Sequence, residues 1–254
     1  MSYLKINVNG TNLFMEDGKV VSLHDPEGFE VIRKLWEYTN WANKYSYNFT
    51  WLGRPIIQLP DDVLRIQEII YKIKPTLIIE TGVAHGWSLI LYASLLKLLG
   101  RGRVIGVDIE IRDHNRIAIE KHEMSPIITL IEGSSIAPEI TESIRQQIKE
   151  DDIVLVILDS CHTKDHVLQE LKLYSPFVTQ NSYIIVADGI MQDVAGAPRT
   201  QEDWKWDNPQ QAVKEFLQEY PGFTNEEWSP VFRESNVNTM PTYYPNGFLK
   251  KISK

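Results

Sequence analysis

The stretch LIIETGVAHGWS, residues 77–88, carries the strongest fold signal in this chain of 254 residues. Three apolar residues predict a buried strand that ends at Glu80, a turn with Gly82 and Gly86 follows, and an apolar helix begins directly after it. A strand that turns through glycines into a helix brings backbone N–H groups and the positive end of the helix dipole to one place. We therefore predict a ligand site at this turn, the alternative being a strand-turn-helix unit that binds nothing.

The spacing of the glycines indicates which ligand the turn suits. A dinucleotide-binding turn has the pattern G-x-G-x-x-G, in which the second glycine makes room for a pyrophosphate. Here Ala84 stands where that glycine would be, and the strand closes with the carboxylate of Glu80. That carboxylate would repel a pyrophosphate but attract an ammonium group, such as the one at the methionine end of S-adenosylmethionine.

The composition limits the partners and the setting of the protein. A formal net charge of −8 and a pI near 5.3 argue against non-specific binding of nucleic acid, which needs a basic surface. Cys161 is the only cysteine, which excludes an internal disulfide and a multi-cysteine zinc site. The longest apolar runs, such as residues 153–158, are too short to span a bilayer, and residues 1–10 lack the apolar stretch of a signal peptide. We therefore expect a soluble cytoplasmic protein.

Beyond residue 58, continuous apolar strands alternate with amphipathic helical segments. Such alternation is typical of a mostly parallel sheet covered by helices on both faces, so we predict an α/β, Rossmann-like domain over residues 59–254. Its strands are predicted at 77–80, 103–107, 127–131, 153–158 and 183–187, with C-terminal strands around 231–232 and 247–252. Its helices are predicted to begin near Pro60, after the glycine turn, before Ile140, soon after Asp159, and at Pro209 with Asn208 as N-cap.

Residues 1–58 are predicted to form a small N-terminal extension. Alternating apolar residues from Leu4 to Val8 and the turn at Asn9-Gly10 predict hairpins outside the main sheet. A helix is predicted after Pro26. The aromatic, irregular segment 45–59 fits two interpretations equally well, because aromatic residues serve both as core anchors and as the lid or wall of a substrate site.

Polar residues end the predicted strands, at the edge where open parallel sheets bind ligands. Asp108 ends the second strand, where a carboxylate can accept both hydroxyls of a ribose; a solvated strand-end acid is the alternative. Asp159 and Asp188 end two strands that are expected to be neighbours. Two carboxylates facing one crevice suit a hard divalent cation, so we predict a Mg²⁺ site there.

Two histidines follow the first of these aspartates. His162 is predicted at the start of the next helix, close enough to take a proton from a substrate hydroxyl that the metal has made more acidic; bonding a backbone group at the helix start is the alternative. His166 lies one helical turn later, where it can share that face, but a structural role is the favoured interpretation. Cys161 is interpreted as a packing residue, because no other pattern marks it as a nucleophile.

Several motifs together resemble those of one enzyme family. They are TWLGRPIIQLPDD, IIETGVAHGWSL, VIGVDI, VILDSCHTKDH and IIVADGI, followed by NPQQAVKEFL and PNGFLKKI near the end. Over residues 51–252 the chain is similar to the cephalosporin hydroxylase family, which also contains the rhamnosyl O-methyltransferases. That family resembles class I S-adenosylmethionine-dependent methyltransferases with a divalent metal at the acceptor site.

The resemblance implies a role for each residue at a matching position. The methionine part of the cofactor would be lined by the turn that ends at Gly86, through Glu80, Gly82 and Ser88, the ribose by Asp108, and the adenine by Ser134 and Ser135. The metal would be held by Asp159 and Asp188, and His162 falls where related sugar O-methyltransferases keep a base. One departure is Ala187, where some relatives have an acid, so the metal shell is one carboxylate poorer here. The resemblance also implies a homo-oligomer.

The hypothesis from sequence is therefore methyl transfer from S-adenosylmethionine to a hydroxyl of a sugar or a glycosylated natural product, assisted by a divalent metal. The loop at residues 189–207 and the aromatic segment would cover the acceptor. An iron-dependent hydroxylase is one alternative, with Asp159, His162 and His166 as ligands, although it leaves the glycine turn without a task. A non-catalytic nucleoside-binding protein on the same fold is the other, and Ala187 supports it.

Overall fold

The computed structural model describes residues 7–232 and 234–253, and its centre is a seven-stranded sheet in the order β11-β12-β10-β9-β6-β7-β8. The strands are β6 (Leu77–Thr81), β7 (Arg103–Asp108), β8 (Ile128–Glu132), β9 (Val154–Leu158), β10 (Tyr183–Val186), β11 (Phe223–Asn225) and β12 (Phe248–Lys251). From β10 to β8 all neighbouring strands are parallel, and β12 runs antiparallel to both of its neighbours. The chain order reverses between β6 and β9, and this is the point at which such sheets bind ligands.

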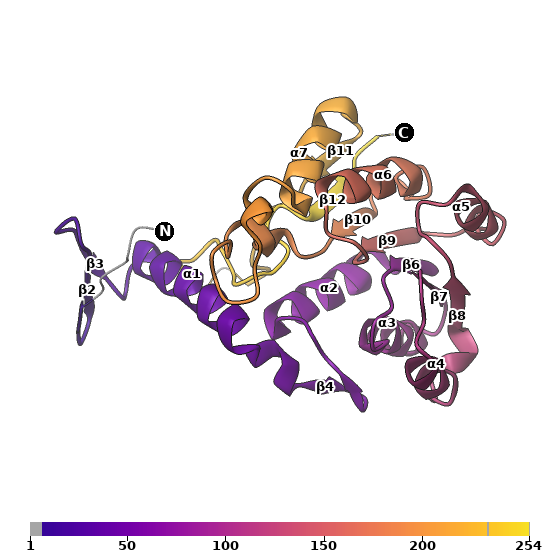
Figure 1. Cartoon of the computed structure of the whole chain (residues 1–254), viewed down its shortest axis with the longest axis horizontal. Coiled ribbons are helices and arrows are strands. Elements are labelled where there is room, and N and C mark those ends of the chain that lie inside the picture. The colour runs from indigo at the N-terminus through magenta and orange to yellow at the C-terminus, as the bar shows by residue number, and fades with distance from the viewer. Residues whose placement is uncertain (1–6, 233, 254) are drawn as a thin grey trace.

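Helices cover both faces of this sheet and enclose two hydrophobic cores (Figure 1). One face packs against α2 (Pro60–Ile73), α3 (Trp87–Leu98) and α4 (Asp113–Glu120). The other packs against α5 (Pro138–Arg145), α6 (Lys164–Tyr174) and α7 (Pro209–Glu219). Every side chain of β6, β9 and β10 is buried, which explains why these strands read as continuous apolar runs rather than as alternating ones. The predicted doubly wound α/β fold is confirmed.

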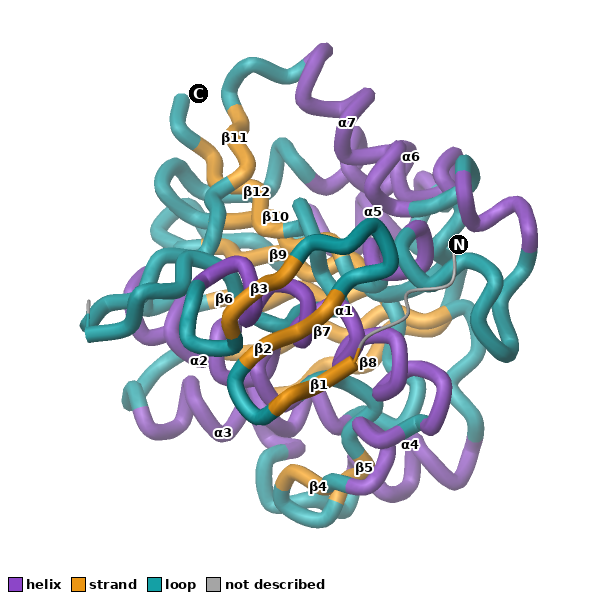
Figure 2. The backbone as a smooth tube through the Cα atoms, turned by 90° about the vertical axis from the view of Figure 1, so that its left-hand side faces the viewer, coloured by secondary structure: helices purple, strands orange, loops and turns teal. Residues whose placement is uncertain are grey.

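The N-terminal part forms a separate small sheet on a long helix. It contains β1 (Asn7–Asn9), β2 (Asn12–Phe14), β3 (Val20–Ser22), α1 (Pro26–Asn43), β4 (Thr50–Trp51) and β5 (Arg54–Pro55). The sheet β1-β2-β3 projects from one end of α1, away from the main sheet, and faces the viewer in Figure 2. This confirms the predicted hairpins for residues 7–22, while the predicted alternation at Leu4 and Ile6 lies outside the described residues. The division of the chain after residue 58 stays a prediction.

Two predictions about individual elements were wrong, and one helix was not predicted. Val231 and Phe232 lie in an exposed loop, and the strand before them is β11, because backbone pairing with β12 begins at Phe223. The helix α4 was not predicted, since it is short and buries one polar and one apolar residue, Asn115 and Ile119, which leaves no apolar stripe in the sequence. His162 does not start a helix: α6 begins at Lys164, and the extended residue Thr163 separates the two.

Several connections between these elements contain short 3-10 turns. These cover residues 45–48 after α1, 125–127 before β8, and 189–192 and 202–205 within the loop between β10 and α7. Asn208 caps α7, because its side-chain oxygen accepts the N–H of Gln211 at 3.2 Å, as predicted. Among the residues that the structure describes, no helix is long and apolar enough to cross a membrane.

Candidate active site

Asp159 and Asp188 meet at the carboxyl edge of the sheet. They follow β9 and β10, which pair in parallel, so the prediction that the two acids end neighbouring strands is confirmed. His162 lies in the loop after β9 and turns back toward them. One ligand atom from each of these three residues lies within 4.8 Å of the others, and His162 Nε2 is 3.4 Å from Asp188 Oδ2.

The chemistry of these three side chains fits a divalent cation. Burial, and then the neighbouring Asp188 carboxylate, raise the pKa of Asp159 well above its usual range. A cation between the two aspartates would remove this repulsion, and carboxylate oxygens are the ligands that Mg²⁺ prefers. Ala187 is fully buried and its N–H bonds Leu158 O at 2.9 Å, so this position faces the core rather than the cation. The third candidate ligand atom of the cluster belongs to His162.

His166 is not part of this group. Its Nε2 lies 3.2 Å from both Ser135 Oγ and Ser160 Oγ, and Ser160 in turn donates to the buried Glu170. The structural interpretation of His166 is therefore the one that its contacts support. The two-histidine, one-carboxylate set of the iron hydroxylase alternative is not assembled, because the cluster contains two carboxylates and one imidazole. Cys161 is exposed beside Thr163.

The glycine turn lies directly beside Asp159. Gly82 has a φ of +89°, and a side chain there would place its Cβ 1.9 Å from the carbonyl oxygen of Asp159. Gly86 has a φ of +74° and precedes the first residue of α3. Only glycine satisfies both the backbone angle and the close approach at residue 82, which explains its place in the sequence.

Side chains from three directions hold this turn in place. The carboxylate of Asp108 accepts the N–H groups of Val83 at 2.8 Å and Ala84 at 3.2 Å. Asn115 donates to Ala84 O, and Arg54 donates to His85 O and to Asn115 Oδ1. Arg54 and Asn115 were not identified from the sequence, because their partners are backbone carbonyls that lie far away in the chain. The ribose role of Asp108 stays a prediction.

Glu80 and Ser88 form a buried pair beneath the turn. Ser88 donates to Glu80 Oε2 at 2.6 Å, and Tyr92 donates to Glu80 Oε1 at 2.9 Å. Burial raises the pKa of Glu80 to about 8, even though both hydrogen bonds lower it. Contact of Glu80 and Ser88 with a cofactor stays a prediction, and in the structure each has the other as its partner.

The loop after β8 carries Ser134 and Ser135. Ser135 is buried and contacts His166 through its hydroxyl, while its carbonyl accepts the hydroxyl of Tyr174 at 2.9 Å. Ser134 is partly exposed, and its carbonyl accepts the N–H of Ala137 at 2.9 Å. These bonds fix the loop at the carboxyl edge, and the predicted adenine contact is untested.

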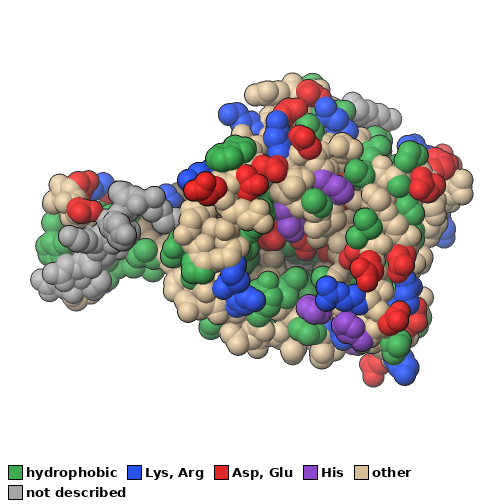
Figure 3. Space-filling model, in the orientation of Figure 1, with side chains coloured by type: hydrophobic (Ala, Val, Ile, Leu, Met, Phe, Trp, Pro, Cys, Tyr) green, Lys and Arg blue, Asp and Glu red, His purple; other side chains and the backbone are tan. Residues whose placement is uncertain are grey.

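A cavity of about 80 Å³ opens beside the two aspartates. Figure 3 shows the hollow, with acidic side chains deep inside it and histidines near its rim. Its walls come from segments far apart in the sequence: Trp41, Lys44, Ser46, Tyr47, Ile57, Gln58, Arg199 and Tyr243. The aromatic segment and the loop after β10 thus both contribute to it, as expected. Two tryptophans of that loop do not line the cavity: Trp204 packs edge-on against Trp41, and Trp206 is exposed.

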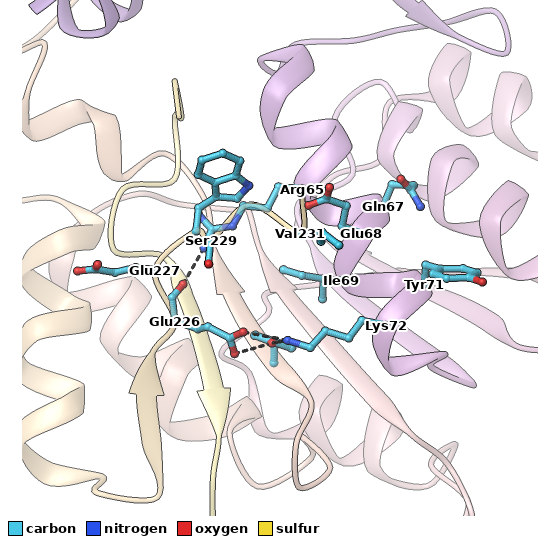
Figure 4. Close-up of a pocket in the computed structure, with 12 residues that line it drawn as sticks. Arg65, Gln67, Glu68, Ile69, Tyr71, Lys72, Glu226, Glu227, Ser229 and Val231 are labelled. Carbon is cyan, nitrogen blue, oxygen red and sulfur yellow. Dashed lines mark hydrogen bonds and ion pairs between the residues drawn. The ribbon is translucent and has the colours of Figure 1, made fainter. Parts of the chain in front are cut away.

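A second hollow, of about 290 Å³, lies between α2 and the segment after β11 (Figure 4). Lys72 forms an ion pair with Glu226 at 2.9 Å, and Tyr183 donates to the same carboxylate at 2.6 Å. Tyr183 is the first residue of β10, so this hollow lies at the amino end of the parallel strands. The hollow therefore lies at the edge of the sheet opposite to the one that carries the aspartates.

Comparison with known proteins agrees with this geometry. The family model described as Rhamnosyl O-methyltransferase/CmcI matches residues 43–252. The chain is 31% identical over 220 residues to the rhamnosyl O-methyltransferase of Mycobacterium leprae (strain TN), covering 84% of this chain and 88% of the relative. It is 28% identical over 218 residues to the rhamnosyl O-methyltransferase of Mycobacterium tuberculosis (strain ATCC 25618 / H37Rv), with 84% and 83% covered.

Solved structures share the fold at lower sequence identity. The apo structure of CmcI-N160 superposes with a TM-score of 0.57 at 18% identity, over 85% of this chain and 84% of that one. The structure of cmcI-D160 with Mg and SAM gives a TM-score of 0.55 at 18% identity, over 82% and 78%. A putative caffeoyl-CoA O-methyltransferase from Staphylococcus aureus gives 0.51 at 18% identity, over 77% and 84%. The family model covers most of the chain, and the chain therefore belongs to the rhamnosyl O-methyltransferase/CmcI family of S-adenosylmethionine-dependent methyltransferases.

Proposed function

We propose that this protein transfers the methyl group of S-adenosylmethionine to a hydroxyl of a sugar or a glycosylated natural product, with help from a divalent metal ion. The observation that carries the proposal is the convergence of Asp159, His162 and Asp188 between the glycine turn and the acceptor cavity. The names of the relatives, rhamnosyl O-methyltransferase, support a sugar acceptor. The solved cmcI-D160 structure with Mg and SAM supports both cofactors.

The sulfonium of S-adenosylmethionine is already a strong methyl donor, so the protein mainly has to align donor with acceptor and remove a proton from the acceptor. The turn from Gly82 to Gly86 is assigned to the donor. Asp159 and Asp188 would hold Mg²⁺, which would lower the pKa of a hydroxyl bound to it. The aromatic rings of Trp41, Tyr47 and Tyr243 give the acceptor cavity walls that suit a sugar ring.

His162 can act either as a metal ligand or as the general base, and one ring nitrogen cannot do both. Its Nε2 lies 3.4 Å from Asp188 Oδ2, close enough to serve as a third ligand to the metal or to accept the proton of the acceptor hydroxyl. A nitrogen lone pair that binds the metal cannot also take up the proton. We assign His162 as the general base, because the two aspartates already bring two negative charges to a divalent ion.

The test is methyl transfer from radiolabelled S-adenosylmethionine to a panel of monosaccharides and glycosides, with Mg²⁺ binding measured by calorimetry on the same samples. Asp188→Asn should weaken Mg²⁺ binding and abolish transfer while S-adenosylmethionine still binds. His162→Ala should lower kcat by about 10²- to 10⁴-fold and leave Mg²⁺ affinity within a few-fold of the wild type. His24→Ala is the matched control, because His24 lies beside the N-terminal sheet.

Other outcomes would favour other functions. Loss of Mg²⁺ binding in His162→Ala would make this residue a ligand instead of the base. Full turnover in the presence of a chelator would remove the metal from the proposal. Binding of S-adenosylmethionine without transfer to any acceptor would support a non-catalytic nucleoside-binding protein. The homo-oligomer stays a prediction, which light scattering on the purified protein tests.

A further inference from the structure

The cavity beside the aspartates is also lined by two positively charged side chains. Lys44 ends α1 and Arg199 lies in the loop between β10 and α7, and both side chains line the cavity that contains Asp159 and Asp188. Within the described residues, neither cation has a carboxylate within 4 Å. Two cations from distant segments therefore face one cavity without an ion pair.

The protein holds the Arg199 side chain in place without neutralising it. Its guanidinium donates to the carbonyl oxygens of Trp41 at 2.5 Å and Ala42 at 3.3 Å, near the end of α1. Neutral carbonyls fix the orientation of the group and leave its charge and its other N–H donors available. The Lys44 ammonium lies 5.4 Å from the centre of the Tyr47 ring, which also leaves its charge uncompensated.

The charges around the cavity favour an acceptor of negative charge. A divalent ion between the aspartates would cancel their charge, so the two cations would face the acceptor with a net charge of +2. Both side chains are exposed to solvent, so an acceptor that displaces this water removes their solvation unless it brings a group of opposite charge.

We propose that the acceptor carries an anionic group, a carboxylate or a phosphate, which Lys44 and Arg199 bind while Asp159 and Asp188 hold the metal beside the reacting hydroxyl. This inference rests on the proposed function and narrows its substrate class to acidic sugars, of the uronic acid or sugar phosphate type. Both anions accept the paired N–H groups of a guanidinium, so this chemistry is common to the two.

The test measures binding of matched sugar pairs to protein loaded with Mg²⁺ and S-adenosylhomocysteine. Methyl α-D-glucoside is compared with methyl α-D-glucuronide, and L-rhamnose with L-rhamnose 1-phosphate. The anionic member of at least one pair should bind about 10- to 100-fold more tightly, the worth of one charge-assisted contact, and the pair that shows it identifies the anion. The preference should shrink as ionic strength rises.

Variants assign the preference to the two cations. Arg199→Gln and Lys44→Gln should each remove most of it and leave the neutral sugars unaffected. Arg101→Gln, an exposed arginine in the turn between α3 and β7, is the matched control and should change nothing. Equal or tighter binding of the neutral members, an anion preference that survives both substitutions, or no binding of any anionic sugar would overturn the inference. Failure of S-adenosylhomocysteine itself to bind would instead refute the proposed function.

Discussion

Replacing Glu80 with Gln tests whether the buried carboxyl beneath the glycine turn is protonated in the folded protein. Glu80 is 1% exposed, and its two oxygens accept the hydroxyls of Ser88 and Tyr92. Burial raises its pKa from 4.5 to about 8, so the carboxyl is protonated in the folded protein at pH 7 and ionised in the unfolded chain. Gln has the same shape and no charge, and its amide can pair with both hydroxyls.

The sign of the pH dependence follows from this difference in proton uptake. Between pH 4.5 and about 8 the unfolded chain binds fewer protons at this residue than the folded protein does. The contribution of Glu80 to the free energy of unfolding is therefore fully present below pH 4.5 and falls by about 1.4 kcal/mol per pH unit as pH rises. The whole interval corresponds to a loss on the order of 5 kcal/mol, after which the contribution is constant. Glu80→Gln removes this loss.

Urea unfolding of the ligand-free protein at pH 5, 6, 7, 8 and 9 measures the effect. The free energy of unfolding of Glu80→Gln minus that of the wild type should increase with each pH unit. This difference should become constant above pH 8. Glu68→Gln, at an exposed acid on α2, is the matched control and should give a constant difference. A difference between Glu80→Gln and the wild type that does not change with pH would refute the assignment of a protonated, buried carboxyl.

The same variant decides whether Glu80 meets the cofactor. An ammonium group needs the ionised carboxylate, so cofactor binding near pH 7 would release a proton from Glu80. Calorimetry with S-adenosylhomocysteine in two buffers of different ionisation enthalpy detects that proton. If Glu80 binds the ammonium, Glu80→Gln should lose both the proton release and most of the affinity. If the acid serves only Ser88 and Tyr92, the affinity should be unchanged.

Four further substitutions test the close packing at two glycines, one ion pair and one helix cap. Gly82→Ala should lower the free energy of unfolding in urea by more than about 3 kcal/mol, because the new Cβ meets a backbone oxygen. Gly86→Ala should lower this free energy by less, because the new Cβ there meets the end of the flexible Ile119 side chain. Asp152→Asn should lower the free energy of unfolding by about 2 kcal/mol at pH 7. Although burial opposes ionisation, hydrogen bonds led by that from Arg103 lower the pKa of Asp152 to about 2, so the wild type but not the variant should lose stability between pH 4 and 2. Asn208→Ala should lower the thermal midpoint, at a cost of about 1 kcal/mol for a lost cap.

The architecture could be predicted because its signals are local. A strand buried on both faces, such as β9, reads as an unbroken apolar run, and the turn at Gly82 marks where a strand gives way to a helix. The strands at the edge of the sheet carry weaker signals. In β11 only Phe223 is buried and backbone pairing defines the element, which is why the more apolar but exposed residues 231–232 were mistaken for a strand.

The acids of the site could be predicted for a related reason. Parallel strands end at one edge, so a carboxylate directly after each of two neighbouring strands has to lie near the other, as Asp159 and Asp188 do. No such rule places Lys44, Arg199 or Tyr243 in the cavity. They come from a helix end and from two loops, and their positions depend on tertiary packing that no periodicity encodes.

The two halves of the site differ in how firmly the fold fixes them, and this bears on specificity. The donor turn and the metal aspartate are joined by backbone: Gly82 N–H bonds Val107 O at 2.7 Å, Asp159 N–H bonds Thr81 O at 2.8 Å, and the absent Cβ of Gly82 lets the two segments touch. Under the proposed function, the sheet would thus set the distance between the methyl donor and the reacting hydroxyl, as in-line transfer requires. Lys44 and Arg199, which we propose bind the acceptor, lie outside the sheet, so substitutions there should change the acceptor without disturbing the alignment of the transfer.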